Sequence, residues 1–96
     1  MVDIKKLEKG LEELTGYDFE DAEREIRQKG DMTPDVIFSK NFQTKLAAKA
    51  MGITSDKIKA MGIREYVEIT TTTSNFLLGN LVAKKMEQDL PKPIGK

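Results

Sequence analysis

Carboxylates are the side chains of this chain best suited to acid–base chemistry. The 96 residues include no histidine, cysteine or tryptophan. This removes the commonest general base, the thiol nucleophile and most transition-metal ligand sets. Acidic residues gather at Glu12-Glu13 and along Glu20–Glu25, at spacings typical of exposed helix faces rather than of an opposed catalytic pair. We therefore expect no enzyme, no catalytic or metal site and no cofactor.

The sequence also lacks the residue spacing of known ligand-binding loops. Asp31 and Asp35 lack the ligand series of a calcium loop. The glycines are scattered along the chain rather than gathered in a phosphate-binding loop. Hydroxyl and amide side chains do gather, from Thr70 to Asn75. This run is either a polar binding face or filler on a helix whose hydroxyls bond back to the preceding turn.

Charge and hydropathy exclude two further classes. Lysine plus arginine equals aspartate plus glutamate, at 16 each, so the chain lacks the basic field of a dedicated nucleic-acid binder. A net charge of zero also gives little protection against self-association. No apolar run is long enough to span a bilayer, and charges interrupt the N-terminus too early for a signal peptide. We expect an intracellular protein without membrane contact.

Helical periodicity predicts an all-α fold, a small bundle of four to five helices with a long C-terminal helix. Residues 1–90 should form one domain and residues 91–96 a flexible tail. Asp18 is the expected cap of the second helix, and Thr33-Pro34 resembles a helix start. The run Val36–Phe38 fits one turn of helix, a short strand or the start of the next helix. The expected helices begin near residues 4, 18, 40, 55 and 64.

One pentapeptide, Lys-Ala-Met-Gly-Ile, occurs at Lys49–Ile53 and again at Lys59–Ile63. Both copies are typical of a helix end, in which a left-handed glycine is followed by an apolar residue that folds back. Ile53 should then contact Ala48, and Ile63 should contact Ile58. Two such ends isolate a short helix between them. The five methionines of the chain are spread out, so no methionine-rich groove is expected.

The last helix carries two apolar stripes on nearly opposite sides. The first, which we expect to face the core, comprises Ile63, Val67, Thr70, Ser74, Leu77 and Leu81. The second is our candidate partner surface, because so short a chain can hardly bury both; it comprises Ile69, Thr72, Phe76, Gly79, Ala83, Met86 and Leu90. The predicted core is Ile4, Leu7, Leu11, Leu14, Phe19, Ile26, Phe42, Leu46, Ile53, Ile58, Ile63, Val67, Leu77 and Leu81.

A helix-turn-helix is one alternative. Ala48, Gly52 and Ile58 have the spacing at which two helices of that motif pack around a glycine turn. The recognition helix would be Thr54–Met61, which holds Asp56, only two lysines and no arginine. DNA binding is therefore the alternative reading rather than our preferred one.

The order of several motifs resembles the small tail assembly chaperones of long-tailed bacteriophages and prophages. The residues that carry the resemblance lie in three segments, Leu46–Ile53, Ile58–Tyr66 and Ser74–Leu77. They correspond to an alanine-rich helix ending in glycine, a junction with Arg-Glu-Tyr, and an Asn-Phe-Leu helix segment. Upstream, 21–24 and 29–31 also match. Gly62 stands where the family more often has leucine.

This resemblance implies a helical, non-enzymatic protein of the host bacterial cytoplasm. Such chaperones bind the long hydrophobic tape measure protein, keep it in solution and help the major tail protein polymerise around it. An amphipathic helix suits that task, as in helix-in-groove recognition. Weak self-association into a homo-oligomer through the same surface fits the same picture. A structural tail or head-completion protein is a further alternative.

Overall fold

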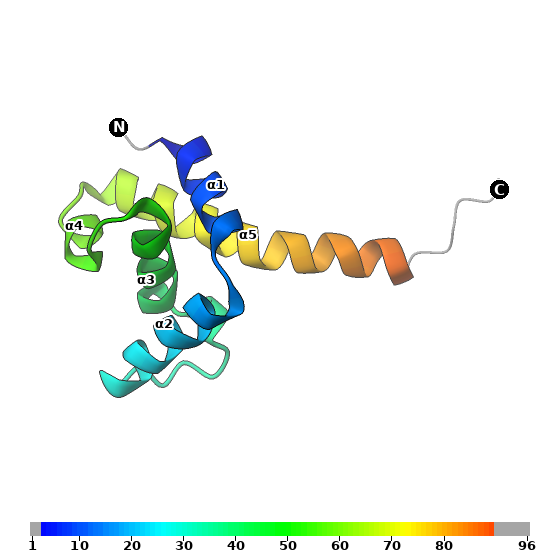
Figure 1. The fold of residues 1–96 in the computed structure, drawn as a ribbon, viewed down its shortest axis with the longest axis horizontal. Coiled ribbons are helices and arrows are strands. Elements are labelled where there is room, and N and C mark those ends of the chain that lie inside the picture. The colour runs from blue at the N-terminus through cyan, green and yellow to red at the C-terminus, as the bar shows by residue number, and fades with distance from the viewer. Residues whose placement is uncertain (1–2, 90–96) are drawn as a thin grey trace.

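The computed structural model describes the backbone of residues 3–89 and the side chains of residues 3–79. Over this range the chain is an all-helical bundle with a long C-terminal helix, as predicted (Figure 1). The elements are α1 (Ile4–Glu13), α2 (Gly16–Gln28), the short 3-10 helix η1 (Val36–Phe38), α3 (Lys40–Met51), α4 (Ser55–Lys59) and α5 (Ile63–Asp89). The predicted tail, residues 91–96, lies outside the described part of the chain.

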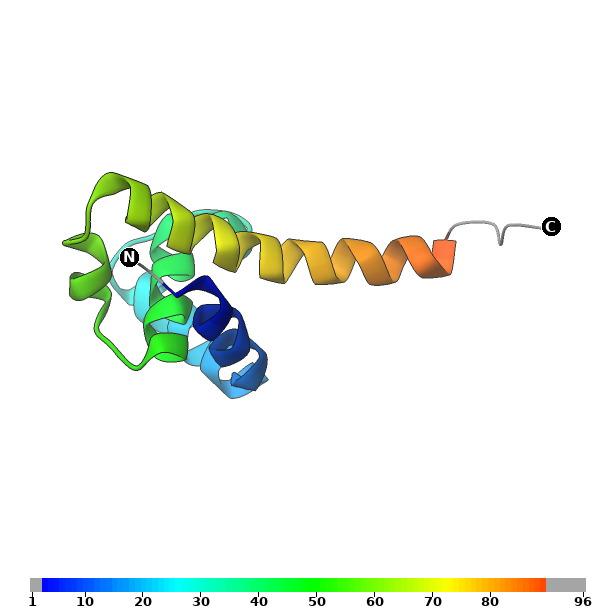
Figure 2. The same cartoon turned by 90° about the horizontal axis from the view of Figure 1, so that it is seen from above.

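Helix α3 lies at the centre and contacts α1, α2, α4 and α5. Its Ala47 and Ala48 are buried, and such small side chains let neighbouring helices approach closely. Helix α1 approaches α3 closely at Gly10, where an added Cβ would lie 2.3 Å from the carbonyl oxygen of Ala50. Helix α5 packs across this group with its first half and then projects beyond it (Figures 1 and 2).

Most of the predicted core is confirmed. Buried members are Leu7, Leu11, Ile26, Phe42, Leu46 and Ile58, and half-buried members packed against them are Ile4, Leu14, Phe19, Ile53 and Leu77. Two members are wrong, because Ile63 is 81% exposed and Val67 is 49% exposed. The side chain of Leu81 lies outside the described residues. The core also contains Val36 and Ile69, which the prediction lacked.

The prediction for α5 was wrong about which side of the helix faces the core. Its buried face consists of Ile69, Thr70 and Thr73 and lies between the two predicted stripes. Threonines can fill this face because their hydroxyls are satisfied locally. The hydroxyl of Thr73 donates to the carbonyl oxygen of Ile69 at 2.9 Å, and that of Thr70 donates to Val67 at 3.2 Å. The threonine run is thus partly core filler, one of the two readings left open by the sequence.

Two helix starts differ from the prediction. Helix α2 is capped by Thr15 rather than Asp18, because the Asp18 carboxylate accepts the Thr15 N–H at 2.9 Å and so fixes the turn from within the helix. Pro34 begins no helix. Asp35 instead caps η1 by accepting the Ile37 N–H at 3.2 Å. The run Val36–Phe38 is therefore one helical turn.

The two copies of the pentapeptide form different structures. At the first copy, Gly52 is left-handed with φ 69°, and the Ile53 N–H donates to the Ala48 carbonyl at 3.1 Å, as predicted. At the second copy, the left-handed glycine is absent: positive-φ glycines among the described residues are Gly30 and Gly52. Helix α4 ends at Lys59, and the residue that caps it, Ala60, has right-handed geometry. The Gly62 carbonyl already accepts the Tyr66 N–H of α5. The predicted contact of Ile63 with Ile58 is wrong, since α5 starts at Ile63 and exposes it.

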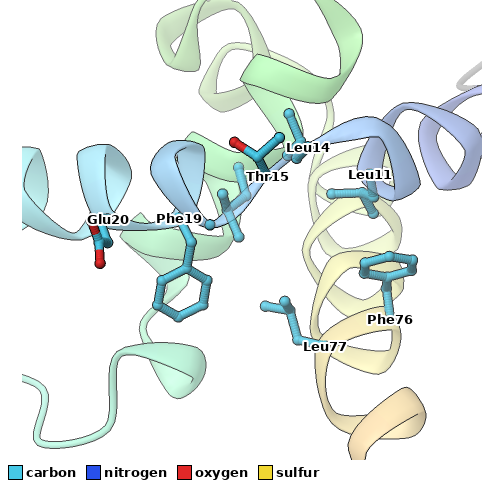
Figure 3. Close-up of a pocket in the computed structure, with 9 residues that line it drawn as sticks. Leu11, Leu14, Thr15, Phe19, Glu20, Phe76 and Leu77 are labelled. Atoms are coloured by element: carbon cyan, nitrogen blue, oxygen red, sulfur yellow. The ribbon is translucent and has the colours of Figure 1, made fainter.

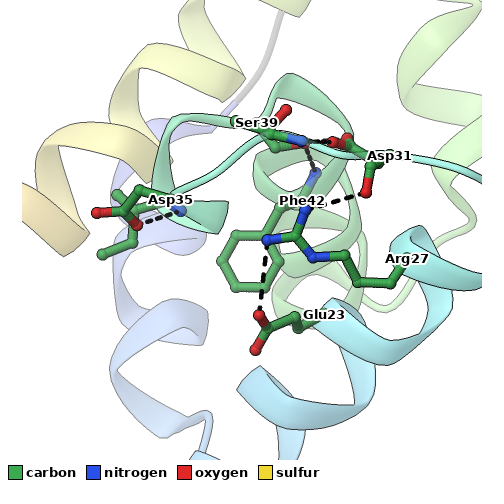
Figure 4. A network of polar contacts seen from close by, with 8 residues as sticks. Glu23, Arg27, Asp31, Asp35, Ser39 and Phe42 are labelled. Carbon is green, nitrogen blue, oxygen red and sulfur yellow. Dashed lines mark hydrogen bonds and ion pairs between the residues drawn. The ribbon is translucent and has the colours of Figure 1, made fainter.

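Asp31 organises the connection from α2 to α3 (Figure 4). Its carboxylate accepts hydrogen bonds from the Ser39 hydroxyl, the Thr33 N–H and the Asn41 amide. Ser39 in turn caps α3 by accepting the N–H of Phe42 at 3.2 Å. The hydrogen bond from Ser39, followed by those from Thr33 and Asn41, holds the pKa of Asp31 well below its usual range. The loop thus depends on an ionised carboxylate.

Acidification should therefore weaken the fold through Asp31. A group whose pKa is lower in the folded state stabilises it fully above the unfolded pKa of about 3.9 and loses this contribution as pH falls below that value. Asp31→Asn should lower the free energy of unfolding at neutral pH and reduce the further loss between neutral pH and about pH 3. Urea titrations at both pH values measure this. Parallel pH profiles for the native chain and the variant would contradict it.

Candidate functional site

An apolar pocket opens where α1, α2, α3 and α5 meet. Its volume is about 340 Å³. The polar side chains that line it are those of Thr15 and Glu20, and the remaining lining residues are Leu11, Leu14, Gly16, Phe19, Leu46, Phe76 and Leu77. With one carboxylate and one hydroxyl against this apolar wall, the pocket is suited to binding an apolar side chain rather than to bond-breaking chemistry.

The pocket is built by the break between α1 and α2. Leu14 ends α1 in an extended conformation, and the Thr15 cap then starts α2 in a new direction. Phe19 is thereby held edge-on against Phe42 of α3, with ring centroids 4.7 Å apart and an interplanar angle of 66°. Figure 3 shows Phe19 and Leu77 on opposite sides of the pocket. The wall contributed by α2 thus rests on the core, which gives the pocket a preformed shape.

The residues of the candidate partner stripe on α5 differ in their burial. Ile69 is fully buried in the core, so its assignment to a partner surface is corrected. Thr72 and Phe76 are half-buried, and Gly79 is exposed. The side chains of Ala83 and Met86, and the whole of Leu90, lie outside the described residues. Phe76 reaches the pocket, which makes it the stripe residue with a defined binding environment.

A second depression, a groove, lies between α1 and α5. It has a volume of about 360 Å³ and is lined by Glu8, Glu12, Thr72, Asn75 and Phe76. Phe76 therefore separates two hollows, the apolar pocket on one side and this acidic groove on the other. Sequence patterning assigned Phe76 to a surface but contained no signal for either hollow, because both require α1 and α5 to be placed side by side.

The two pentapeptides do meet in space, although they end their helices differently. Met51 and Ile53 from the first copy and Met61 from the second line one depression of about 420 Å³. Charged side chains, including those of Asp3 and Lys6, complete its lining, so two of the methionines lie together without forming a methionine-rich groove. Methionine side chains adapt to irregular apolar partners. In the sequence, Met51 and Met61 are related by the ten-residue spacing of the two pentapeptides.

The helix-turn-helix residues have the packing that their spacing predicted. Ala48 and Ile58 are buried on either side of the left-handed Gly52. The second helix of this pair, α4, has five residues, and its exposed side chains include one aspartate, Asp56, and two lysines, Lys57 and Lys59. So short and mixed a helix offers few contacts to a DNA groove.

Comparison with protein-family models, with curated proteins and with solved structures gives no match to this chain. Within the described residues, no group of three or more histidine, cysteine, aspartate or glutamate side chains is placed to hold a metal ion. In the same part of the chain, no helix is both long enough and apolar enough to cross a membrane. The apolar pocket and the adjoining surface of α5 are the strongest candidate site.

Proposed function

We propose that this chain is a non-enzymatic tail assembly chaperone of a long-tailed bacteriophage, acting in the host cytoplasm. Its client is the tape measure protein, which it keeps available while the major tail protein polymerises. The observation that carries the proposal is the preformed apolar pocket between α1, α2 and α5. The order of the sequence motifs supports the choice of client.

The pocket suits a helical, apolar client. Its lining combines the flat ring of Phe19 with the branched side chains of Leu11 and Leu77. Binding of one client side chain there would gain about 25 cal/mol per Å² of apolar surface removed from water, less the cost of ordering the client. Several such contacts along a long client would give avidity from individually weak sites.

Co-expression with a tape measure protein tests the proposal. The native chain should co-purify with the client. Phe76→Asp should reduce recovery of the complex about tenfold, because a carboxylate buried in the pocket costs about 1.4 kcal/mol or more. Phe38→Asp is the matched control, since Phe38 is 60% exposed and lies outside the pocket. If no complex with the native chain survives purification, the proposal is wrong.

A second variant separates loss of binding from loss of folding. Phe76 also packs against the core, so Phe76→Asp needs a companion that retains every core contact. Gly16 lines the pocket, and a Cβ added there would meet no atom within 4 Å. Gly16→Phe should therefore obstruct the pocket while the chain keeps its thermal transition. Recovery of the client should then fall, as it does for Phe76→Asp.

The two alternatives make different predictions. A structural tail or head-completion protein would remain in purified virions, whereas a chaperone is absent from them. A DNA-binding regulator would shift duplex DNA in a mobility assay, with binding that weakens steeply with salt and is lost on replacing Lys57 and Lys59 by alanine. Either result would replace the chaperone proposal.

A further inference from the structure

The apolar pocket and the acidic groove lie side by side along the same two helices. On α1, Leu11 lines the pocket and the next residue, Glu12, lines the groove. On α5, Phe76 lines both hollows, with Asn75 in the groove and Leu77 in the pocket. Side chains three or four positions apart on a helix lie about 5–6 Å from each other at Cβ. A helix bound along α1 and α5 can therefore place neighbouring side chains of one face in the two hollows.

The carboxylates around these hollows are not neutralised by the chain itself. Glu8 and Glu12 line the groove, Glu20 lines the pocket, and all three are exposed. None of the ion pairs among the described residues involves them, and no lysine or arginine of that part of the chain lines either hollow. On the same bundle, by contrast, Glu25 pairs with Lys45 at 2.9 Å. The surface thus combines an apolar wall with negative charge that is open to a partner.

This charge selects the kind of client helix. We propose that the surface binds a basic amphipathic helix, with an apolar side chain in the pocket and a lysine or arginine one turn away in the groove. This narrows the client proposed above, and so rests on that function, to segments whose apolar face is flanked by basic residues. An acidic side chain in the same place would face the carboxylates of Glu8 and Glu12, and like charges oppose binding.

The groove offers several contacts to such a cation. Glu8 and Glu12 are one turn apart on α1, so both carboxylates can approach a single guanidinium or ammonium group. The side-chain oxygens of Thr72 and Asn75 can accept further hydrogen bonds. The ring of Phe76 can contact the cation or the aliphatic stem that carries it. The basic side chain thus has polar partners for its tip and an apolar partner for its stem.

Fluorescence anisotropy with synthetic helical peptides tests the charge preference. Three peptides of about 18 residues, or about five turns, share one leucine stripe and differ at the flanking positions, which hold lysine, glutamine or glutamate. At low salt the native chain should bind the lysine peptide about tenfold more tightly than the glutamine peptide, and the glutamate peptide should bind weakest. The differences should shrink in about 0.5 M salt, because screening weakens contacts between exposed charges. Equal binding of the three peptides, or no binding of the lysine peptide, would overturn the proposal.

Charge reversal in the groove tests where the preference arises. Glu8→Lys with Glu12→Lys should invert the order, so that the glutamate peptide binds more tightly than the lysine peptide. Glu13→Lys with Glu68→Lys is the matched control, because it changes the net charge equally at carboxylates that line neither hollow, and it should keep the native order. All four positions are exposed, so both variants should retain the thermal transition of the native chain. A control that inverts the order as fully as the groove variant would contradict the assignment to the groove.

The chaperone function and the preference for a basic helix can fail separately. Gly16→Phe should weaken binding of all three peptides alike, because Gly16 lines the apolar pocket and not the groove. If the tape measure protein co-purifies but the peptides show no charge preference, the preference is wrong and the proposed function stands. If the lysine peptide binds as described but no tape measure protein is recovered, the client is wrong and the preference for a basic helix stands.

Discussion

Replacing Gly10 by alanine is expected to destabilise the fold by roughly 1–3 kcal/mol, the usual cost of forcing an extra methyl group into a packed interior. The new Cβ would lie 2.3 Å from the carbonyl oxygen of Ala50 and 3.1 Å from its Cβ. Backbone atoms cannot move aside as the tip of a side chain can, so α1 and α3 must separate. Urea titration of the purified chain measures the change in the free energy of unfolding.

Gly16→Ala is the matched control for this prediction. Gly16 is also helical, but an added Cβ there meets nothing within 4 Å. Alanine should therefore leave stability unchanged or raise it by up to about 1 kcal/mol through its helix propensity. If Gly10→Ala proves as stable as Gly16→Ala, the close approach of α1 and α3 is not present in solution.

Replacing Phe42 by alanine should have the largest effect, about 3–5 kcal/mol. The ring is fully buried at the centre of the molecule and packs edge-on against Phe19. Its removal leaves a cavity between α2 and α3 and takes away the support of the pocket wall. Because small domains are stable by only about 5–15 kcal/mol, the thermal transition of the variant should move to a much lower temperature.

Phe38→Ala provides the comparison. Phe38 lies four residues earlier in the chain and is 60% exposed, so its truncation should change the free energy of unfolding by less than about 1 kcal/mol. The difference between the two variants isolates the contribution of burial. Similar losses at both positions would contradict the placement of Phe42 in the core and of Phe38 at the surface.

Local patterns were sufficient where a residue's environment lies within its own helix. The 3-4-3 spacing of Ile4, Leu7, Leu11 and Leu14 placed all four on the inner side of α1. The left-handed Gly52 followed from the Schellman pattern, which needs only the preceding turn. The same logic failed at Gly62, because an identical pentapeptide was immediately followed by a new helix that used its carbonyl.

Local patterns were insufficient for α5, which carries two apolar stripes. Both stripes of α5 satisfied helical periodicity, and our prediction that the first faces the core placed Ile63 and Val67 inward, where the structure exposes them. Contact with α1, α3 and η1 selected a face between the two stripes, with Ile69, Thr70 and Thr73 at its centre. Threonine is compatible with this choice only because its hydroxyl can donate to the preceding turn, which hides its polarity from the core.

The sequence by itself determined that this protein is helical, where most of its helices begin and end, and which side of the first four faces inward. Periodicity and capping depend on residues close together in the chain, so they can be predicted from the sequence. Only the tertiary structure decided which side of α5 faces the core, the need for glycine at position 10, and the two hollows on either side of Phe76. The need for glycine at position 10 depends on how α1 lies against α3, and the two hollows depend on how α1 lies against α5. These are relations between residues far apart in the chain, which no local pattern encodes.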